Sequence, residues 1–220
     1  MLVRNWMQTD LITLQSDDSL DVAKTLMKTR KIRRIPIIDE KGRLKGIISQ
    51  EDIKKALPAE VDATLDSKAR ALANQLEISA FMTPEPITAT PDDTMESVAS
   101  LMRTYKIGGI PVVEGELLAG IITESDIYDA FVEALGGKNR DTRIELTINR
   151  GSDAIYKLFE VLSVFGTPLN NVVICNSYSS KRKAVILRID GGKREEEVIE
   201  ALWECGCQIN SISSGTGKKQ

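Results

Sequence analysis

The chain has 220 residues, of which 42% are hydrophobic and 28% charged, a composition typical of a folded globular protein. Its net charge of −3 gives no overall attraction for nucleic acid, and no stretch approaches the ~20 apolar residues of a membrane-spanning helix. Histidine is absent, and with it the commonest general base and the commonest zinc ligand. We therefore expect no enzyme activity, no metal or other cofactor, and neither nucleic-acid nor membrane partners.

An internal repeat organises the first part of the chain, up to about residue 135. Aligning Pro36 with Pro111 superposes matching residues along most of both copies, once one residue in an intervening turn is skipped. This agreement indicates a duplication. The matches include Met7 with Met82, Asp17-Asp18 with Asp92-Asp93, Lys31-Ile32 with Lys106-Ile107, and Gly46-Ile47-Ile48 with Gly120-Ile121-Ile122.

Each copy predicts the element order β–α–β–β–α. A helix follows the paired aspartates, which are N-cap candidates, and a second helix begins near Ser49 or Thr123. Between the helices, two β-branched runs predict a hairpin. The predicted hairpin strands are 35–38 and 44–48 in the first copy, and 110–113 and 117–122 in the second; an extra helix is expected at 59–76.

The last third of the chain does not match the repeat and predicts the order βαββαβ, a ferredoxin-like pattern. Its strands alternate apolar and polar residues, and its helices carry one apolar face. We expect three domains with the boundaries 1–78, 79–138 and 142–214. The predicted elements are strands 143–148, 172–178, 184–189 and 208–212, and helices 154–165 and 195–203.

The repeated residues resemble the CBS-domain motif, here as a tandem pair. The shared pattern runs from Met through Ile-Thr and Asp-Asp to Leu-Met, Lys-Ile-x-x-Ile-Pro and Gly-Ile-Ile-(Ser/Thr)-x-x-Asp-Ile. Residues 142–214 resemble an ACT domain, and the whole order resembles the bacterial acetoin-utilisation-type CBS/ACT family. The resemblance implies a mixed α/β fold in which two CBS domains pack as a pair and a ferredoxin-like ACT domain follows.

The resemblance also implies that an adenine nucleotide (AMP, ADP or ATP) binds as a regulatory ligand in two clefts. In the family, the Asp of (Ser/Thr)-x-x-Asp accepts hydrogen bonds from ribose hydroxyls, and the Ser or Thr lies at a helix entry that suits a phosphate. Site A would combine Thr123 and Asp126 with Arg33 and Arg34, near Ile12 and Ile32. Site B would combine Ser49 and Asp52 with Gly108 and Gly109, near Ile87 and Ile107.

The two sites differ because Arg33-Arg34 in one copy align with Gly108-Gly109 in the other. Guanidinium groups bind phosphates in bidentate geometry, whereas glycines supply only amides and space. We therefore expect site A to prefer a ligand with several phosphates. Two plainer interpretations remain: the aspartates can serve only as helix caps, and the arginines can form surface ion pairs with Glu51 or with a second subunit.

We expect a regulatory homodimer in which the ACT domain serves dimerisation or signal transmission, and a regulated enzyme is a candidate partner. Two alternatives stay open. One is a sensor of adenosylmethionine, because ribose recognition by the aspartate is common to both kinds of ligand. The other is a structural adaptor that binds no ligand.

Three cysteines, an odd number without a paired framework, suit a reducing compartment, so we expect a cytoplasmic protein. Cys205 and Cys207 have a spacing that could indicate metal or redox chemistry. With no histidine and only Cys175 elsewhere, one chain cannot assemble a closed four-ligand zinc site. We expect no metal there.

Overall fold

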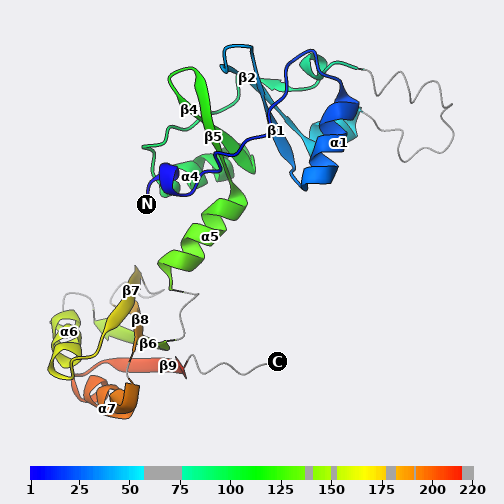
Figure 1. Ribbon diagram of the computed structural model, residues 1–220. Coiled ribbons are helices and arrows are strands. Elements are labelled where there is room, and N and C mark those ends of the chain that lie inside the picture. Colours follow the sequence, from blue (N-terminus) through cyan, green and yellow to red (C-terminus); the bar gives the residue numbers. More distant parts are fainter. Residues whose placement is uncertain (57–75, 137–140, 150–152, 177–181, 191, 215–220) are drawn as a thin grey trace. The chain divides into compact units, whose positions relative to one another are not determined.

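The computed structural model describes the chain except residues 57–75, 137–140, 150–152, 177–181, 191 and 215–220 (Figure 1). The chain divides into two units, Met1–Tyr128 and Asp129–Gln220, which we describe separately. The extra helix expected at 59–76 lies outside the described residues. No helix in the described part of the chain is long and apolar enough to cross a bilayer.

The first unit holds the two copies of the repeat, and each copy forms the expected hairpin between two helices. Helices α1 and α2 pack on the first hairpin, and Leu20, Ile35 and Ile48 are fully buried there. The first copy contains α1 (Leu20–Arg30), β1 (Arg34–Ile38), β2 (Leu44–Ser49) and α2 (Gln50–Ala56). The second contains α4 (Met95–Tyr105), β4 (Gly109–Glu114), β5 (Leu117–Thr123) and α5 (Glu124–Ala134), the last of which continues beyond this unit.

Two expectations about the start of each copy need correction. The N-caps are Ser19 and Thr94, and not the aspartates before them. The side chain of each accepts a hydrogen bond from the backbone N–H group three residues later in the chain. Asp18 and Asp93 instead accept from the backbone N–H groups of Gln15 and Thr90, at 2.7 and 2.6 Å. The expected first strand is reduced to one isolated bridge per copy, Leu14 with Ile37 and Ala89 with Val112.

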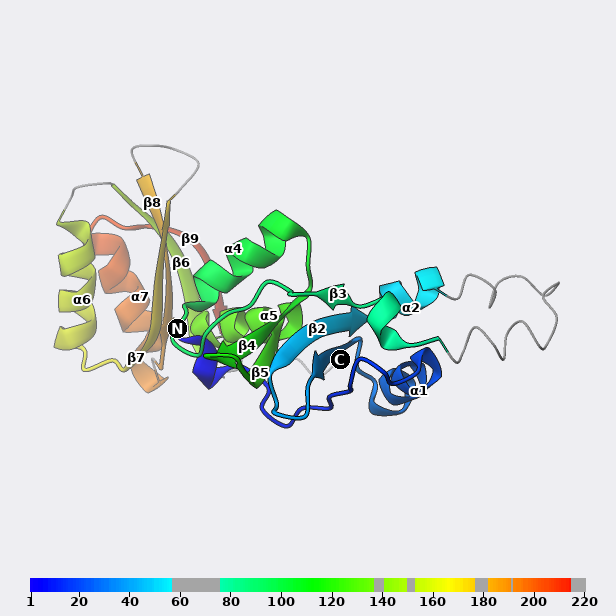
Figure 2. The ribbon, with the colours of Figure 1, turned by 90° about the horizontal axis from the view of Figure 1, so that it is seen from above.

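The two copies exchange their leading segments. Gln8 pairs with Ile121 of β5, while β3 (Thr83–Pro84) pairs with β2 of the first copy (Figure 2). The short 3₁₀ helices η1 (Val3–Asn5) and η3 (Ile78–Ala80) also contact the opposite copy. Val3 N–H donates to Asp93 O of the second copy, and Ile78 is buried in the core of the first copy. Neither copy therefore completes its core from its own residues.

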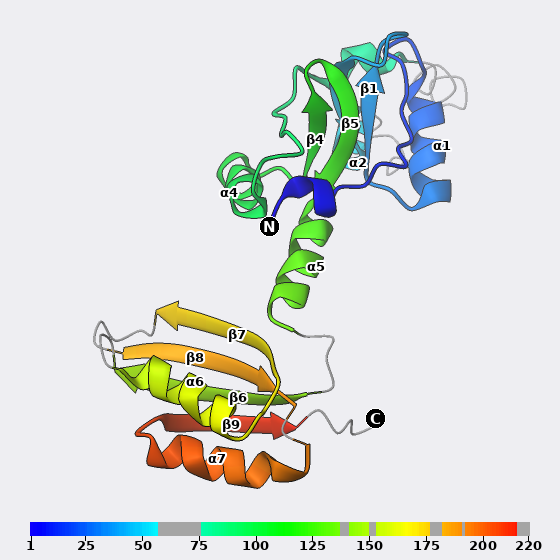
Figure 3. The same ribbon diagram turned by 60° about the vertical axis from the view of Figure 1, so that its left-hand side comes forward.

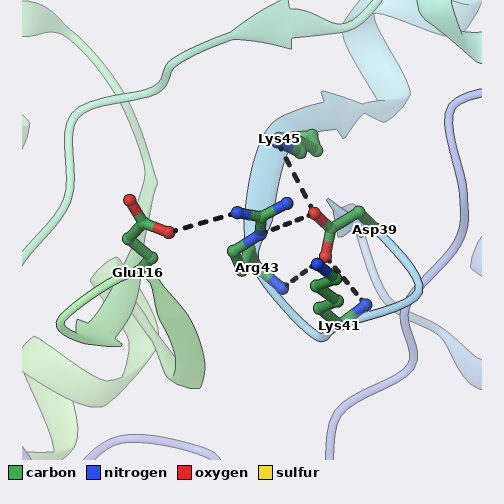
Figure 4. A network of polar contacts seen from close by, with 5 residues as sticks. All are labelled: Asp39, Lys41, Arg43, Lys45 and Glu116. Atoms are coloured by element: carbon green, nitrogen blue, oxygen red, sulfur yellow. Dashed lines mark hydrogen bonds and ion pairs between the residues drawn. The ribbon is translucent and has the colours of Figure 1, made fainter.

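A polar network joins the turns of the two hairpins (Figure 4). Asp39 accepts from the backbone N–H groups of Arg43 and Lys41 at 2.9 and 3.0 Å, and from Arg43 Nε at 2.8 Å. Arg43 Nη1 also lies 3.5 Å from Glu116 of the second hairpin. The Arg43 backbone N–H lowers the pKa of Asp39 most, and its side chain and Lys41 N–H lower it further, to about 2.

We predict that Asp39→Asn reduces stability in a pH-dependent way. Because the folded-state pKa of Asp39 is depressed from 3.8 to about 2, its stabilising contribution is present above ~pH 4 and is lost as the pH falls toward 2. The thermal midpoints of variant and parent should differ at pH 7 and converge at pH 2. Glu40→Gln, which changes a neighbouring exposed carboxylate, is the control. Parallel midpoint curves for Asp39→Asn and the parent would contradict this account.

The second unit is a four-stranded antiparallel sheet of order β7-β8-β6-β9, with α6 and α7 together on one face (Figures 2 and 3). Strand β6 alternates strictly, with Ile144, Leu146 and Ile148 buried against the helices. This is the βαββαβ order expected from the sequence. The elements are β6 (Thr142–Asn149), α6 (Ala154–Val164), β7 (Leu169–Asn176), β8 (Arg182–Ile189), α7 (Glu195–Glu204) and β9 (Gln208–Ser214).

Candidate functional site

The junction between β5 and α5 holds a buried carboxylate. Asp126 lies in the first turn of α5 and is only 8% exposed. Its Oδ2 accepts hydrogen bonds from Thr123 N and Thr123 Oγ1, at 2.8 and 2.6 Å. Its Oδ1 accepts one from Gln8 Nε2 at 3.0 Å. A buried ionised group needs such partners, so the carboxylate is held in one orientation at the end of the strand.

The corresponding junction of the first copy repeats this geometry. Asp52 Oδ2 accepts from Ser49 N at 2.9 Å and from Ser49 Oγ at 2.6 Å. The position equivalent to Gln8 is Thr83, a shorter side chain in β3. Both aspartates therefore close the strand–helix junction as a cap does, and Asp126 has an additional partner from the exchanged segment.

A cavity of about 410 Å³ lies in front of the Thr123 junction. It brings together the expected site A residues Thr123, Arg33, Arg34, Ile12 and Ile32; Asp126, which is hydrogen-bonded to Thr123, is not among the lining residues. Its size suits a small organic ligand. Of the expected site B residues, Gly108 lines this same cavity; Ser49, Asp52, Gly109, Ile87 and Ile107 do not.

The arginine pair and the glycine pair meet at one place. A β-carbon added to Gly108 would lie 2.6 Å from Arg34 Nη2 and 2.9 Å from Glu124 Oε2. One added to Gly109 would lie 3.0 Å from Arg34 Cδ. The side chain of Arg34 thus extends across both glycines, which leave the space for it. Arg34 and Gly108, which the sequence suggested to belong to separate sites, thus line one cavity together.

The suggested ion pair between Arg34 and Glu51 is only a distant electrostatic interaction. The pKa of Glu51 is lowered mainly by its own backbone N–H, then by the Ser49 hydroxyl, and less by the charge of Arg34. Among the described residues, the side chains of Arg33 and Arg34 form no hydrogen bond and no ion pair. Both guanidinium groups keep their donors available at the cavity.

Sequence reasoning missed several lining residues: Gln8, Asp10, Lys31 and Glu124. Lys31 ends α1 with φ 56°, and Lys106 ends α4 with φ 55° at the equivalent position. This left-handed conformation is unfavourable for a residue with a β-carbon, and glycine is the usual choice at the end of a helix. The repeated Lys-Ile pair was visible in the sequence, but the backbone conformation of its lysine was not.

We predict that Lys31→Gly and Lys106→Gly each stabilise the protein by about 1 kcal/mol, because glycine adopts the left-handed conformation without steric cost. Lys28→Gly, in the last turn of α1, is the matched control and should destabilise by about 1 kcal/mol. Urea unfolding measures all three free energies. Destabilisation by Lys31→Gly equal to that of the control would show that the lysine side chain contributes more than its backbone conformation costs.

Comparison with known proteins adds to this geometry. The model of the CBS domain matches residues 3–59 and 78–133, which together make up more than half of the chain. The chain belongs to the CBS-domain family. The match includes both hairpins and both strand–helix junctions, and residues beyond 133 lie outside it.

Relatives of known sequence match the same region. A CBS domain-containing protein of Dictyostelium discoideum is 30% identical over 136 residues, which are 61% of this chain and 94% of the relative. The L-aspartate semialdehyde sulfurtransferase of Methanocaldococcus jannaschii is 35% identical over 138 residues, 62% of this chain but only 24% of that enzyme. The similarity to the enzyme is therefore a similarity to a minor part of it.

Two solved structures resemble the chain over the CBS pair. The CBS domain pair of protein MJ0100, in complex with 5-methylthioadenosine and S-adenosyl-L-methionine, has a TM-score of 0.52 and 34% identity, covering 63% of this chain and 98% of that one. A putative acetoin utilization protein (AcuB) of Vibrio cholerae also has a TM-score of 0.52, with 30% identity, covering 63% of this chain and 95% of that one. The described residues contain no cluster of three or more histidine, cysteine or acidic side chains that could hold a metal ion.

Proposed function

We propose that the CBS pair is a regulatory module that binds an adenine nucleotide in the cavity beside Thr123. The observation that carries the proposal is the composition of one wall: apolar Ile12 and Ile32 adjoin two arginines that form no ion pair with any residue the structure describes. An adenine ring needs an apolar surface, and phosphates need donors that remain charged at any working pH. The cavity offers both within a volume of about 410 Å³.

The ribose would bind at the strand–helix junction. Gln8 Nε2 donates a hydrogen bond to Asp126 Oδ1. A sugar hydroxyl that binds this oxygen therefore shares the oxygen with the Gln8 amide or displaces that amide. The backbone of Gln8 is held by two hydrogen bonds to Ile121, of 2.9 and 3.0 Å. At this junction only the side chain of Gln8 therefore has to rotate, and its backbone stays in place when the ligand enters.

The phosphates would lie toward Lys31, Arg33 and Arg34. The acidic groups Asp10 and Glu124 also line the cavity, and Glu124 lies near Arg34 beside Gly108. Moving Arg34 from its place above Gly108 to a phosphate would separate its guanidinium from Glu124. A ligand regulates only when it binds one arrangement more tightly than another. A phosphate that repositions Arg34 supplies such a difference, and adenosine alone does not.

An adenosylmethionine sensor is the second candidate. It is supported by the 34% identity with the CBS pair of MJ0100, whose complex contains that compound. Asp10 and Glu124 on the cavity wall would suit a ligand that carries positive charge. A ligand-free adaptor is the remaining alternative, and the binding experiment below decides among the three.

For the second unit we propose an ACT-type domain that pairs two chains or passes on the signal, in a cytoplasmic homodimer acting on a regulated enzyme. The support is the βαββαβ order with sheet order β7-β8-β6-β9. Strand β7 lies at a free sheet edge and exposes Leu169 and Ile174, and Tyr156 of α6 is also exposed. A role in acetoin utilisation is part of the same proposal and is supported by the likeness to AcuB.

We predict that one adenosine compound among AMP, ADP, ATP and adenosylmethionine raises the thermal midpoint of the full chain. At a hundredfold its dissociation constant, a ligand stabilises the folded state by about 2.7 kcal/mol. Asp126→Asn should weaken binding by tenfold or more, because a hydrogen bond to a charged group contributes about 1.5–3 kcal/mol. The matched control Asp52→Asn should leave this affinity within about twofold, since Asp52 is hydrogen-bonded to Ser49 at the other strand–helix junction, and Ser49 does not line this cavity.

The outcomes separate the candidates. Binding of a phosphate-bearing nucleotide that is lost in Asp126→Asn supports the proposal, whereas binding of adenosylmethionine alone favours the second candidate. Loss in Asp52→Asn but not in Asp126→Asn would place the ligand in the other cleft. No midpoint shift with any compound would leave the ligand-free adaptor.

A further prediction concerns Gly108→Ala. The new β-carbon would lie 2.6 Å from Arg34 Nη2, and this flexible end of the side chain can move away at little cost in stability. We expect the unfolding midpoint to stay near that of the parent, while affinity for ATP falls and affinity for adenosine does not. Arg34→Ala should have the same selective effect, and the double variant should lose no more than either single one. Additive losses would show that the two positions act separately.

A further inference from the structure

Two thiols of the second unit lie in contact at the end of α7. Cys205 follows the last helical residue, and Gly206, with φ +89°, turns the chain so that Cys207 enters the next strand region. The two Sγ atoms are 3.4 Å apart, and both cysteines are free. The glycine is important here because this backbone conformation is unfavourable for residues with a β-carbon. The fold therefore holds this thiol pair in contact.

The two thiols have different environments. Cys207 belongs to the hydrophobic core and is 3% exposed, whereas Cys205 is partly exposed and its Sγ donates to Leu202 O at 3.2 Å. Burial, and then the neighbouring Cys205, raise the pKa of the Cys207 thiol to about 12. Cys207 thus stays protonated near neutral pH, and Cys205 is the sulfur that a solvent-borne reagent reaches first.

We propose that Cys205 and Cys207 form an oxidation-sensitive dithiol that closes to an intramolecular disulfide when the protein meets a hydroperoxide. Both sulfurs already touch, and one of them is accessible. A disulfide requires a separation of about 2.03–2.05 Å, so closure needs a small further approach at the turn. The resulting cross-link would draw the end of α7 toward the start of β9.

The reaction balances with hydrogen peroxide as oxidant. The Cys205 thiolate attacks one peroxide oxygen, so that an S–O bond forms, the O–O bond breaks, and hydroxide leaves to become water. The sulfenic acid on Cys205 is then attacked by the Cys207 sulfur: the S–S bond forms, the S–O bond breaks, and a second water leaves with the Cys207 proton. Two thiols lose two electrons, and peroxide is reduced to two waters.

The test uses full-length Cys175→Ser, which removes the exposed cysteine of β7 and leaves the pair intact. After hydrogen peroxide treatment, we expect the intact mass to fall by two hydrogen atoms and both remaining thiols to be lost. Peptide mapping should show a cross-link between Cys205 and Cys207, and dithiothreitol should restore both thiols. Because the pair is not substituted in this protein, the result does not depend on whether a variant of the pair folds.

Two further variants in the same background test the order of attack. Cys207→Ser should stop at a sulfenic acid on Cys205 that dimedone traps, whereas Cys205→Ser should react slowly or not at all. The proposal fails if Cys175→Ser gains oxygen atoms instead of losing hydrogens, if it forms only disulfides between chains, or if both thiols survive peroxide. It also fails if dimedone labels Cys207 in Cys205→Ser as readily as it labels Cys205 in Cys207→Ser.

Discussion

The cavity of the first unit depends on a carboxylate that cannot be left without partners. Asp126 is almost fully buried, and its two oxygens receive three hydrogen bonds from Thr123 and Gln8. These bonds link the adjoining end of β5 and first turn of α5 to the segment that precedes α1, which is distant from them in sequence. Because an unpaired buried charge is costly, the segment carrying Gln8 and the strand–helix junction are stabilised together. Thr123 and Gln8, the two partners of this carboxylate, both line the cavity.

At the wall of the cavity, the two copies of the repeat have diverged so that their side chains fit against each other. Arg34 of one copy extends over Gly108 and Gly109 of the other, so a residue that gained a long charged side chain lies against residues that have none. Identical copies would place two arginines against each other, or would leave an empty space between two glycines. Divergence at this one pair of positions gives the unit a single basic wall, with Glu124 close to the guanidinium.

The sequence predicted both hairpins, the helices around them and the order βαββαβ, because these elements have strong local periodicity. Of the site A residues that the resemblance to the CBS motif implies, all but Asp126 line one cavity. The sequence did not reveal that Asp18 and Asp93 form turns while Ser19 and Thr94 cap the helices, because adjacent polar residues compete for the same amides. The contact between Arg34 and Gly108 could not be predicted either, since it depends on how two copies pack and not on any local pattern. The residues of site B and the domain boundaries stay predictions.

The exchange of leading segments has a consequence for assembly. Gln8 pairs with the second hairpin and Thr83 with the first, so a single copy of the repeat would lack the segment that completes its own sheet. Two separate copies would have to find each other by diffusion, and their shared cavity would exist only above some protein concentration. Joining them in one chain replaces that encounter by an intramolecular one, with an effective concentration set by the connecting residues. The cavity is then present at any dilution, so its occupancy by the proposed ligand would depend on the concentration of that ligand and not on that of the protein itself.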